Sequence, residues 1–131
     1  MKRIATLAFA IILVLSCSND DIYAESDIVG TWKLIQIKAD PGDGSAEFRS
    51  VKSEKTIQFK SNGTVSTNTS LCDPYSEEIR TAGKFDLENL TITTNCENPN
   101  IATISFEWQD ETLVLNFISN EGYSQKFQKI D

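Results

Sequence analysis

Hydrophobic and polar residues alternate with a period of two along most of the chain after Ile28. This period is typical of β-strands, whose side chains point alternately to two faces, and no stretch of this part sustains the 3.6-residue period of a helix. Turn-forming residues separate the alternating runs. The pattern predicts eight short strands, at 28–38, 55–60, 64–69, 79–87, 90–95, 101–108, around 113–117 and from 123 onwards.

The connections between these strands differ in length. Those at 61–63, 88–89 and 109–111 are short, and they alternate along the chain with longer ones at 39–53, 70–78, 95–100 and 119–122. In an up-and-down meander, successive connections lie at opposite ends, so every long loop falls at one end. We therefore expect an all-β, eight-stranded up-and-down antiparallel barrel with a closed base and a looped mouth.

The first expected strand changes phase within its length. Trp32 and Leu34 belong to one alternation, and Ile35 and Ile37 belong to the other. An extra residue in one strand of an antiparallel pair produces such a change. The phase change predicts a β-bulge near Leu34.

The amino-acid composition argues against several classes of function. The chain has 12 Lys and Arg, 19 Asp and Glu and no His, with a net charge of -7. Nucleic acid is bound largely through clustered Lys and Arg, so we expect no nucleic-acid partner. Without His in the sequence there is no Ser-His-Asp or Cys-His nucleophilic pair and no His-ligated zinc. We expect no enzyme, no cofactor and no metal site.

The beginning of the chain has the pattern of a targeting segment. Two basic residues follow Met1, and residues 4–15 are apolar except for Thr6. A charged start and an apolar run of this length are typical of a signal peptide. Residues 14–17, Val-Leu-Ser-Cys, resemble the lipobox of bacterial lipoproteins, which implies that Cys17 carries lipid, such as palmitate. An ordinary signal peptide with an incidental Cys is the alternative.

Residues 1–16 are thus expected to be a lipoprotein signal peptide, residues 17–27 a lipidated Cys with a flexible tether, and residues 28–131 the barrel domain. The residue after the Cys, Ser18, resembles the sorting pattern of outer-membrane lipoproteins. The polar segment 18–21 resembles the acidic tag of surface-exported lipoproteins of Bacteroidota, although an ordinary solvated linker has the same composition. We expect a chain anchored to the outer membrane, on its periplasmic face or at the cell surface.

Removal of the signal peptide makes the chain more acidic. It takes away Lys2 and Arg3 and changes the net charge from -7 to -9. Most of this charge falls in the long loops, and we expect an acidic rim that includes Asp73, Glu77, Glu78 and Glu97. Such a rim favours a neutral or cationic ligand or a basic protein partner. Ordinary loop solubility is the alternative.

Two cysteines remain besides Cys17. Cys72 follows the third expected strand and Cys96 the fifth, so both belong to the mouth. In an oxidising compartment, an even pair of cysteines predicts a disulfide. A catalytic thiol is the alternative, but the sequence has no His to activate it.

A short signature opens the first expected strand. Gly30, Thr31 and Trp32 resemble the Gly-x-Trp signature of lipocalins, in which the Trp seals the closed end. With the meander, the loop lengths and the lipobox, residues 28–130 resemble the small lipocalin-like lipoproteins of Bacteroidota. The position of Trp108 at the end of the sixth strand places it beside Trp32 at the base.

Lipocalins place an Arg near the end of the last strand, against the signature Trp. Only Lys126 and Lys129 occupy that region here. The resemblance departs from the family's pattern at this point, and it also departs in length, because the mature chain is short for a lipocalin.

The resemblance implies a non-catalytic protein that binds a small, mostly apolar molecule in the cup. Interior polar groups are expected at Thr67, Thr81, Thr94 and Gln125. The alternative is a barrel filled by its own side chains, which displays acidic loops to a partner protein in the envelope. The side chains expected to line the mouth half of the cup are Ile37, Ile57, Ile79, Ile92, Ile104, Phe117 and Tyr123.

Overall fold

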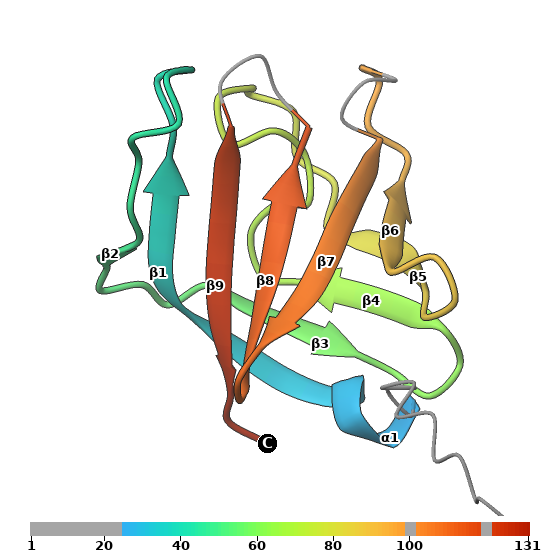
Figure 1. Cartoon of the computed structure of the whole chain (residues 1–131). Coiled ribbons are helices and arrows are strands. Elements are labelled where there is room, and N and C mark those ends of the chain that lie inside the picture. The colour runs from blue at the N-terminus through green and yellow to red at the C-terminus, as the bar shows by residue number, and fades with distance from the viewer. Residues whose placement is uncertain (1–24, 99–101, 119–121) are drawn as a thin grey trace, which may run out of the picture.

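The structure, a computed structural model, describes residues 25–98, 102–118 and 122–131. The expected signal peptide and Cys17 lie outside these residues. One turn of helix precedes nine strands in the described chain (Figure 1). The elements are α1 (Glu25–Ile28), β1 (Gly30–Ala39), β2 (Arg49–Ser50), β3 (Thr56–Phe59), β4 (Thr64–Thr67), β5 (Ala82–Asp86), β6 (Thr91–Thr94), β7 (Thr103–Gln109), β8 (Thr112–Phe117) and β9 (Tyr123–Lys129).

The strands form one closed antiparallel sheet. Each strand from β3 to β8 pairs with the next along the chain, and β1 pairs with β3 on one edge and β9 on the other. The two-residue β2 adds to β1 beyond the end of β3, opposite Gln36 and Ile37. Closure leaves the barrel without long unpaired edges. The predicted eight-stranded up-and-down barrel, built from β1 and β3–β9, is confirmed.

The predicted bulge is also confirmed. Leu34 pairs with Phe127 and Gln36 pairs with Lys126, so Ile35 is the extra residue of β1. Beyond the bulge, Ile37 packs against the core, as Trp32 and Leu34 do before it. One strand therefore faces the interior along its whole length despite the change of phase.

The two ends of the barrel differ as the loop lengths predict. The hairpin turns after β3, β5 and β7 are short and lie at the base, and the longer connections follow β1, β4, β6 and β8. The ends of β1, β6 and β8 point to the top of Figure 1, whereas α1 and the C-terminus lie at the bottom. In the described part of the chain, no helix is both long and apolar enough to cross a bilayer.

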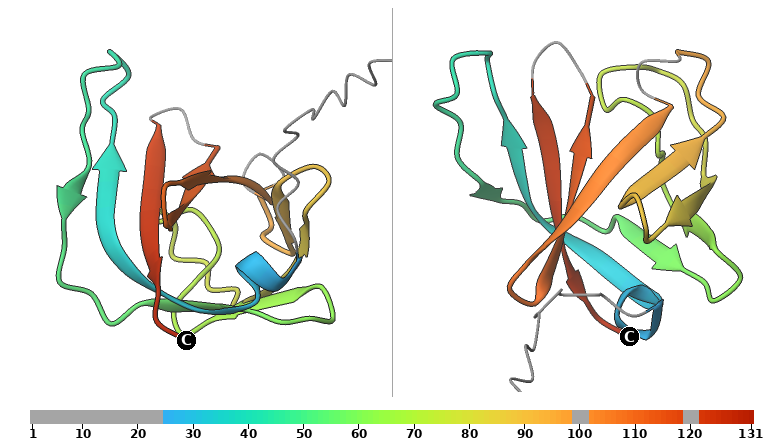
Figure 2. Two further views of the ribbon diagram at one scale, coloured as in Figure 1. Left: turned by 60° about the horizontal axis from the view of Figure 1, so that its bottom comes forward. Right: turned by 45° about the vertical axis from the view of Figure 1, so that its right-hand side comes forward.

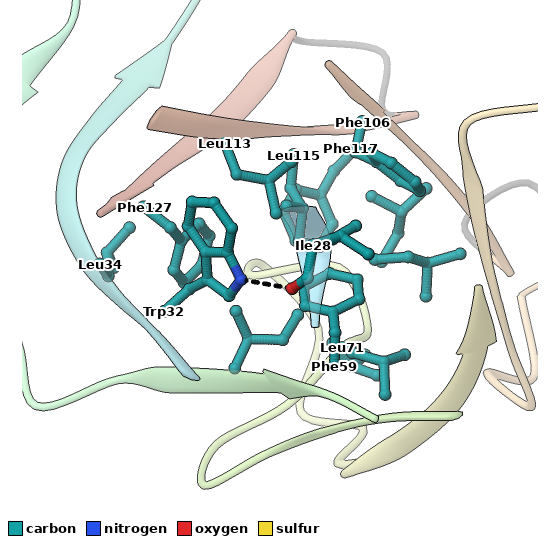
Figure 3. Packing of buried hydrophobic residues seen from close by; sticks show 14 residues of the cluster. Ile28, Trp32, Leu34, Phe59, Leu71, Phe106, Leu113, Leu115, Phe117 and Phe127 are labelled. Carbon is teal, nitrogen blue, oxygen red and sulfur yellow. Dashed lines mark hydrogen bonds between the residues drawn. The ribbon is translucent and has the colours of Figure 1, made fainter. Parts of the chain in front are cut away.

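A single apolar cluster occupies the interior. Its members come from β1, β3, β4 and β6–β9, and it gains Ile28 from α1 and Leu71 from the connection between β4 and β5 (Figure 3). Seen from the base, this connection lies within the ring of strands (Figure 2, left). Full burial of each large apolar side chain contributes about 1.5–3 kcal/mol to the free energy of folding. The interior is a packed core in which a loop residue takes part.

One predicted strand begins too early. Strand β5 starts at Ala82 and not at residue 79, because the amide of Leu71 donates to the carbonyl oxygen of Arg80, at 2.8 Å. This contact turns the chain away from β4 before residue 80. Ile79 is 67% exposed, and Thr81 is exposed as well, so the predictions that these two side chains point inward are wrong.

Candidate functional site

The base of the barrel is sealed around Trp32. Its side chain is buried, and its Nε1 donates to the carbonyl oxygen of Ile28, at 2.8 Å (Figure 3). Lys129 Nζ lies 5.7 Å from the centre of the Trp32 ring. A cation over an indole face is a favourable contact. Of the two lysines in that region, Lys129 thus takes the position against the signature Trp that an Arg has in lipocalins.

The glycine of the signature has a steric role. Gly30 has a φ of 138°, and a Cβ there would lie 2.2 Å from the carbonyl oxygen of Asp131. The same oxygen accepts from the amide of Thr31, and the amide of Ile130 donates to the carbonyl oxygen of Thr31. The missing side chain lets the C-terminus close the start of β1.

The second tryptophan lies at the same end. Trp108 is half-buried, and its ring meets Phe106 edge to face with centroids 5.6 Å apart. Together with Trp32, Asp27 and Lys129 it borders a shallow hollow of about 290 Å³ on the outside of the base. Trp32 seals the interior, and Trp108 covers the edge of that seal.

At the mouth, the predicted disulfide is confirmed. Cys72 and Cys96 are bonded, with their Cα atoms 5.8 Å apart. The bond joins the connection after β4 to the connection after β6. The carboxylate of Glu78 lies within 4.8 Å of both sulfur atoms, but bonded sulfurs are not thiolate ligands for a metal. The pair serves as a covalent tie across the mouth.

Residues 68–81, which we name the mouth loop, fold back over the interior. Leu71 is fully buried in the core. The ring of Tyr75 meets Tyr123 of β9 edge to face with centroids 5.7 Å apart, and Tyr123 in turn meets Phe117 of β8 at 5.8 Å. The mouth is closed by this loop, and the base by strands and a helix.

Part of the expected acidic rim is used inside the loops. The Glu78 carboxylate, 19% exposed, accepts from the amide of Glu97 at 2.9 and 3.0 Å and lies 3.3 Å from Arg80 Nε. Asp73 accepts from the amide of Tyr75. Glu78 and Asp73 therefore stabilise the closed mouth, whereas the side chains of Glu77 and Glu97 are exposed.

The residues expected to line the cup lie at different depths in the barrel. Ile57, Ile92 and Ile104 are fully buried in the core, and Phe117 is buried beside them. Ile37 and Tyr123 are half-buried nearer the mouth, where they pack against the core. Six of the seven expected side chains thus line the interior, and Ile79 does not.

The polar side chains expected in the interior differ in whether they form hydrogen bonds. Thr67 Oγ1 donates to the carbonyl oxygen of Thr56, and Thr94 Oγ1 lies within hydrogen-bond distance of the carbonyl oxygen of Ala102. Gln125 is 4% exposed, and its Oε1 has no hydrogen-bond partner among the described residues. A buried amide oxygen without a partner is costly. It marks a place where a donor is missing.

One inward group was missed by the sequence analysis. Lys55 precedes β3 in the same phase as Ile57 and Phe59, and its Nζ donates to the carbonyl oxygen of Ser70, at 3.0 Å. Nζ also lies 5.9 Å from the centre of the Phe117 ring. Burial lowers the pKa of Lys55 to about 8, because desolvation disfavours the charged amine. The inward direction of Lys55 could have been predicted from the sequence, because Lys55 lies in the same alternation as Ile57 and Phe59.

Comparison with known proteins gives one match. A family model described as a lipocalin-like domain matches residues 28–115, from the end of α1 into β8. No curated protein and no solved structure matches the chain.

Proposed function

Because the chain belongs to the family of lipocalin-like domains, we propose that it is a non-catalytic binding protein that takes a small, mostly apolar molecule through its mouth. The unequal closure of the two ends carries this proposal. The base is held by Trp32, Ile28 and the C-terminal residues, whereas the mouth is covered by a loop. A molecule can enter only where the covering moves.

The ligand space is shared with the mouth loop. Leu71 belongs to the same buried cluster as Phe117, and the ring of Tyr75 meets Tyr123, which packs against that cluster. The expectation of a neutral or cationic ligand came from the loop charges. Two of those carboxylates, on Asp73 and Glu78, already accept hydrogen bonds within the mouth. The ligand charge that the interior favours therefore depends on the groups inside the barrel and not on the loop carboxylates.

Native mass spectrometry tests the binding function. The chain of residues 18–131 contains every strand pairing described above, so it is suitable for purification from the native host without its lipid. We expect a bound molecule of small mass that is released on unfolding. Recovery of the empty protein alone, together with no binding from a small-molecule library, would refute the proposal.

We also propose that lipid on Cys17 anchors the chain to an outer membrane, as in the lipoproteins of Bacteroidota. The lipobox supports the anchor, and the place of α1 gives it an orientation. Because α1 lies at the base, a tether that ends there holds the base toward the membrane and leaves the mouth facing away (Figure 1). The expected tether is shortened by α1 to residues 18–24, and a flexible chain of seven residues spans about 15 Å on average.

Labelling tests the anchor. Cells grown with a palmitate analogue are expected to label the wild-type chain and to leave Cys17→Ala unlabelled and absent from the membrane fraction. Cys72→Ala is the matched control, because its sulfur belongs to the disulfide. Label that survives in Cys17→Ala would contradict the proposal.

A second candidate is an interaction protein that binds a basic partner through its mouth. The observation in its favour is that Glu77 and Glu97 are exposed close to the exposed side chains of Tyr75 and Ile79. Crosslinking in cells is expected to recover one partner from the wild type and much less from a Glu77→Gln/Glu97→Gln variant. Equal recovery from both would exclude this mode of binding.

A further inference from the structure

The mouth holds a partly buried amine on its inner side. Lys55 points inward from the position just before β3, and one of its three protons goes to the carbonyl oxygen of Ser70. Nζ also lies over the Phe117 ring, 5.9 Å from its centre. The ion pairs formed among the described residues do not include Lys55, and the neighbouring Glu54 points outward toward Lys33. Within this part of the chain, no carboxylate forms an ion pair with the amine.

An unpartnered amide oxygen lies on the same inner wall. Gln125 is directly opposite Leu115, and Phe117 is directly opposite Tyr123, so Gln125 and Phe117 are diagonal neighbours across β8 and β9. Gln125 is 96% buried, and its Oε1 accepts no hydrogen bond within the described chain. The amine lies 5.9 Å from the centre of the Phe117 ring, and Gln125 is the diagonal strand neighbour of Phe117.

The Lys55 amine and the Gln125 amide oxygen are together complementary to a carboxylate group on a ligand. An amine with protons to spare seeks an acceptor, and a carboxylate also balances its charge, which makes the hydrogen bond stronger. The amide oxygen seeks a donor, which a hydroxyl group beside the carboxylate, or a water molecule bound to it, would supply. The ring of Phe117 meets Tyr123, and Tyr123 meets the exposed ring of Tyr75, so aromatic surface extends outward from Phe117.

We propose that Lys55 and Gln125 form the polar end of the ligand site and select a small organic acid with an aromatic or other apolar body. This inference rests on the proposed binding function and adds the chemical class of the ligand. The acidic groups at the mouth do not cancel the preference. Glu77 and Glu97 are solvated, so their effect is screened over about 8 Å at physiological salt.

Matched probes test the proposal. Isothermal titration calorimetry with residues 18–131 compares 3-phenylpropanoic acid, 3-phenylpropan-1-ol and 3-phenylpropylamine, which share one body and differ in charge. A charge-assisted hydrogen bond predicts that the acid binds about tenfold or more tightly than the alcohol, with the amine weakest. Lys55→Met is expected to bring acid and alcohol within about twofold while binding of the alcohol is unchanged.

Three further variants separate the site from a folding defect. Lys55→Arg keeps the charge and is expected to retain the preference for the acid. Gln125→Leu is expected to weaken the acid more than the alcohol. Lys38→Met removes a half-buried amine on the outer face, over the Phe48 ring, and is expected to bind like the wild type.

The outcomes are distinct. Binding of the alcohol or the amine as tightly as the acid overturns this inference and leaves the proposed function standing. An acid preference that survives in Lys55→Met overturns the assignment of Lys55. Failure of all three probes, together with an empty protein by native mass spectrometry, overturns both the binding function and the inference.

Discussion

Gly30 shows how one residue of the signature determines local structure. Its φ of 138° is rarely adopted by residues with a side chain, and a Cβ would meet the carbonyl oxygen of Asp131 at 2.2 Å. We expect Gly30→Ala to lower the free energy of unfolding by about 2 kcal/mol or more, from backbone strain and the clash together. Urea unfolding measures the change.

The chain offers a control for the strain alone. Gly42 has a φ of 101°, and a Cβ there would contact nothing within 4 Å. Gly42→Ala therefore carries the backbone cost without the clash, and we expect a smaller loss than for Gly30→Ala. Equal losses at both sites would show that the contact with Asp131 is unimportant.

Lys55 makes a prediction about pH. Its pKa is about 8 in the folded chain, against 10.5 without burial. Below pH 8 both states hold the proton. Between pH 8 and 10 the folded state releases it while the unfolded state keeps it, so the free energy of unfolding rises with pH. Relative to Lys55→Met, we expect the wild type to gain about 2–3 kcal/mol over this interval.

Chemical denaturation at several pH values measures this gain. The difference between the wild type and Lys55→Met isolates one group, because every other titrating residue is common to both. Lys38→Met serves as the outer-face comparison, since its amine lies over Phe48. A wild type that runs parallel to Lys55→Met from pH 8 to 10 would show that the amine is not desolvated.

At the scale of elements, the alternation of hydrophobic and polar residues predicted strands correctly where the strand pairing follows the same period. It failed at the start of β5, where a loop contact ends the pairing. It located β1, β3, β7 and the bulge near Leu34, because register and burial repeat every second residue. It extended β5 back to Ile79, because Ile79 and Thr81 continue the phase of Gly83 and Phe85. The hydrogen bond from Leu71 to Arg80 forms within the connection between β4 and β5, and the alternation of residues does not predict it.

The disulfide belongs to this scale, because it joins two connections. Cys72 and Cys96 close a loop of about 25 residues, for which chain entropy gives about 3.5 kcal/mol. We expect the Cys72→Ala/Cys96→Ala variant to lose stability of this order and to exchange the amides of the mouth loop faster, with β8 and β9 protected as before. Hydrogen exchange resolves the two regions.

Reduction of the wild type is the matched comparison. If the tie acts through the mouth loop, then reducing agent and the double variant are expected to increase exchange at the same residues, 68–81 and 95–98. A uniform increase over the whole barrel would mean that the bond stabilises the fold globally and does not hold the mouth in particular.

At the scale of the molecule, loop lengths and alternation were enough to predict a closed barrel with a base and a mouth. They were not enough to predict how the mouth is closed. Leu71 follows four polar residues, 67–70, and nothing in its neighbourhood marks it as a core residue. Lys55 was placed at the end of a strand, where a charged residue is ordinary, although its phase pointed inward. Both depend on contacts between elements far apart in sequence.

Leu71 therefore has two roles that compete. It fills the interior, and it occupies space that a ligand needs. Its Cδ1 lies 3.4 Å from the position of a Cβ on Gly83, so the missing side chain of Gly83 makes room for it. We expect Leu71→Ala to lower the free energy of unfolding by about 2–5 kcal/mol, because a cavity replaces a fully buried side chain. Affinity for 3-phenylpropan-1-ol is expected to rise in the same variant.

Leu113 is the matched control. It is also fully buried, but it pairs with Phe127 and Trp108 toward the sealed base. Leu113→Ala is expected to lose similar stability without a gain in affinity, since its cavity has no opening at the mouth. Urea unfolding and calorimetry on both variants separate packing from access. If neither cavity improves binding, the ligand does not use the space beneath the mouth loop, and the filled barrel with its exposed acidic loops becomes the better account.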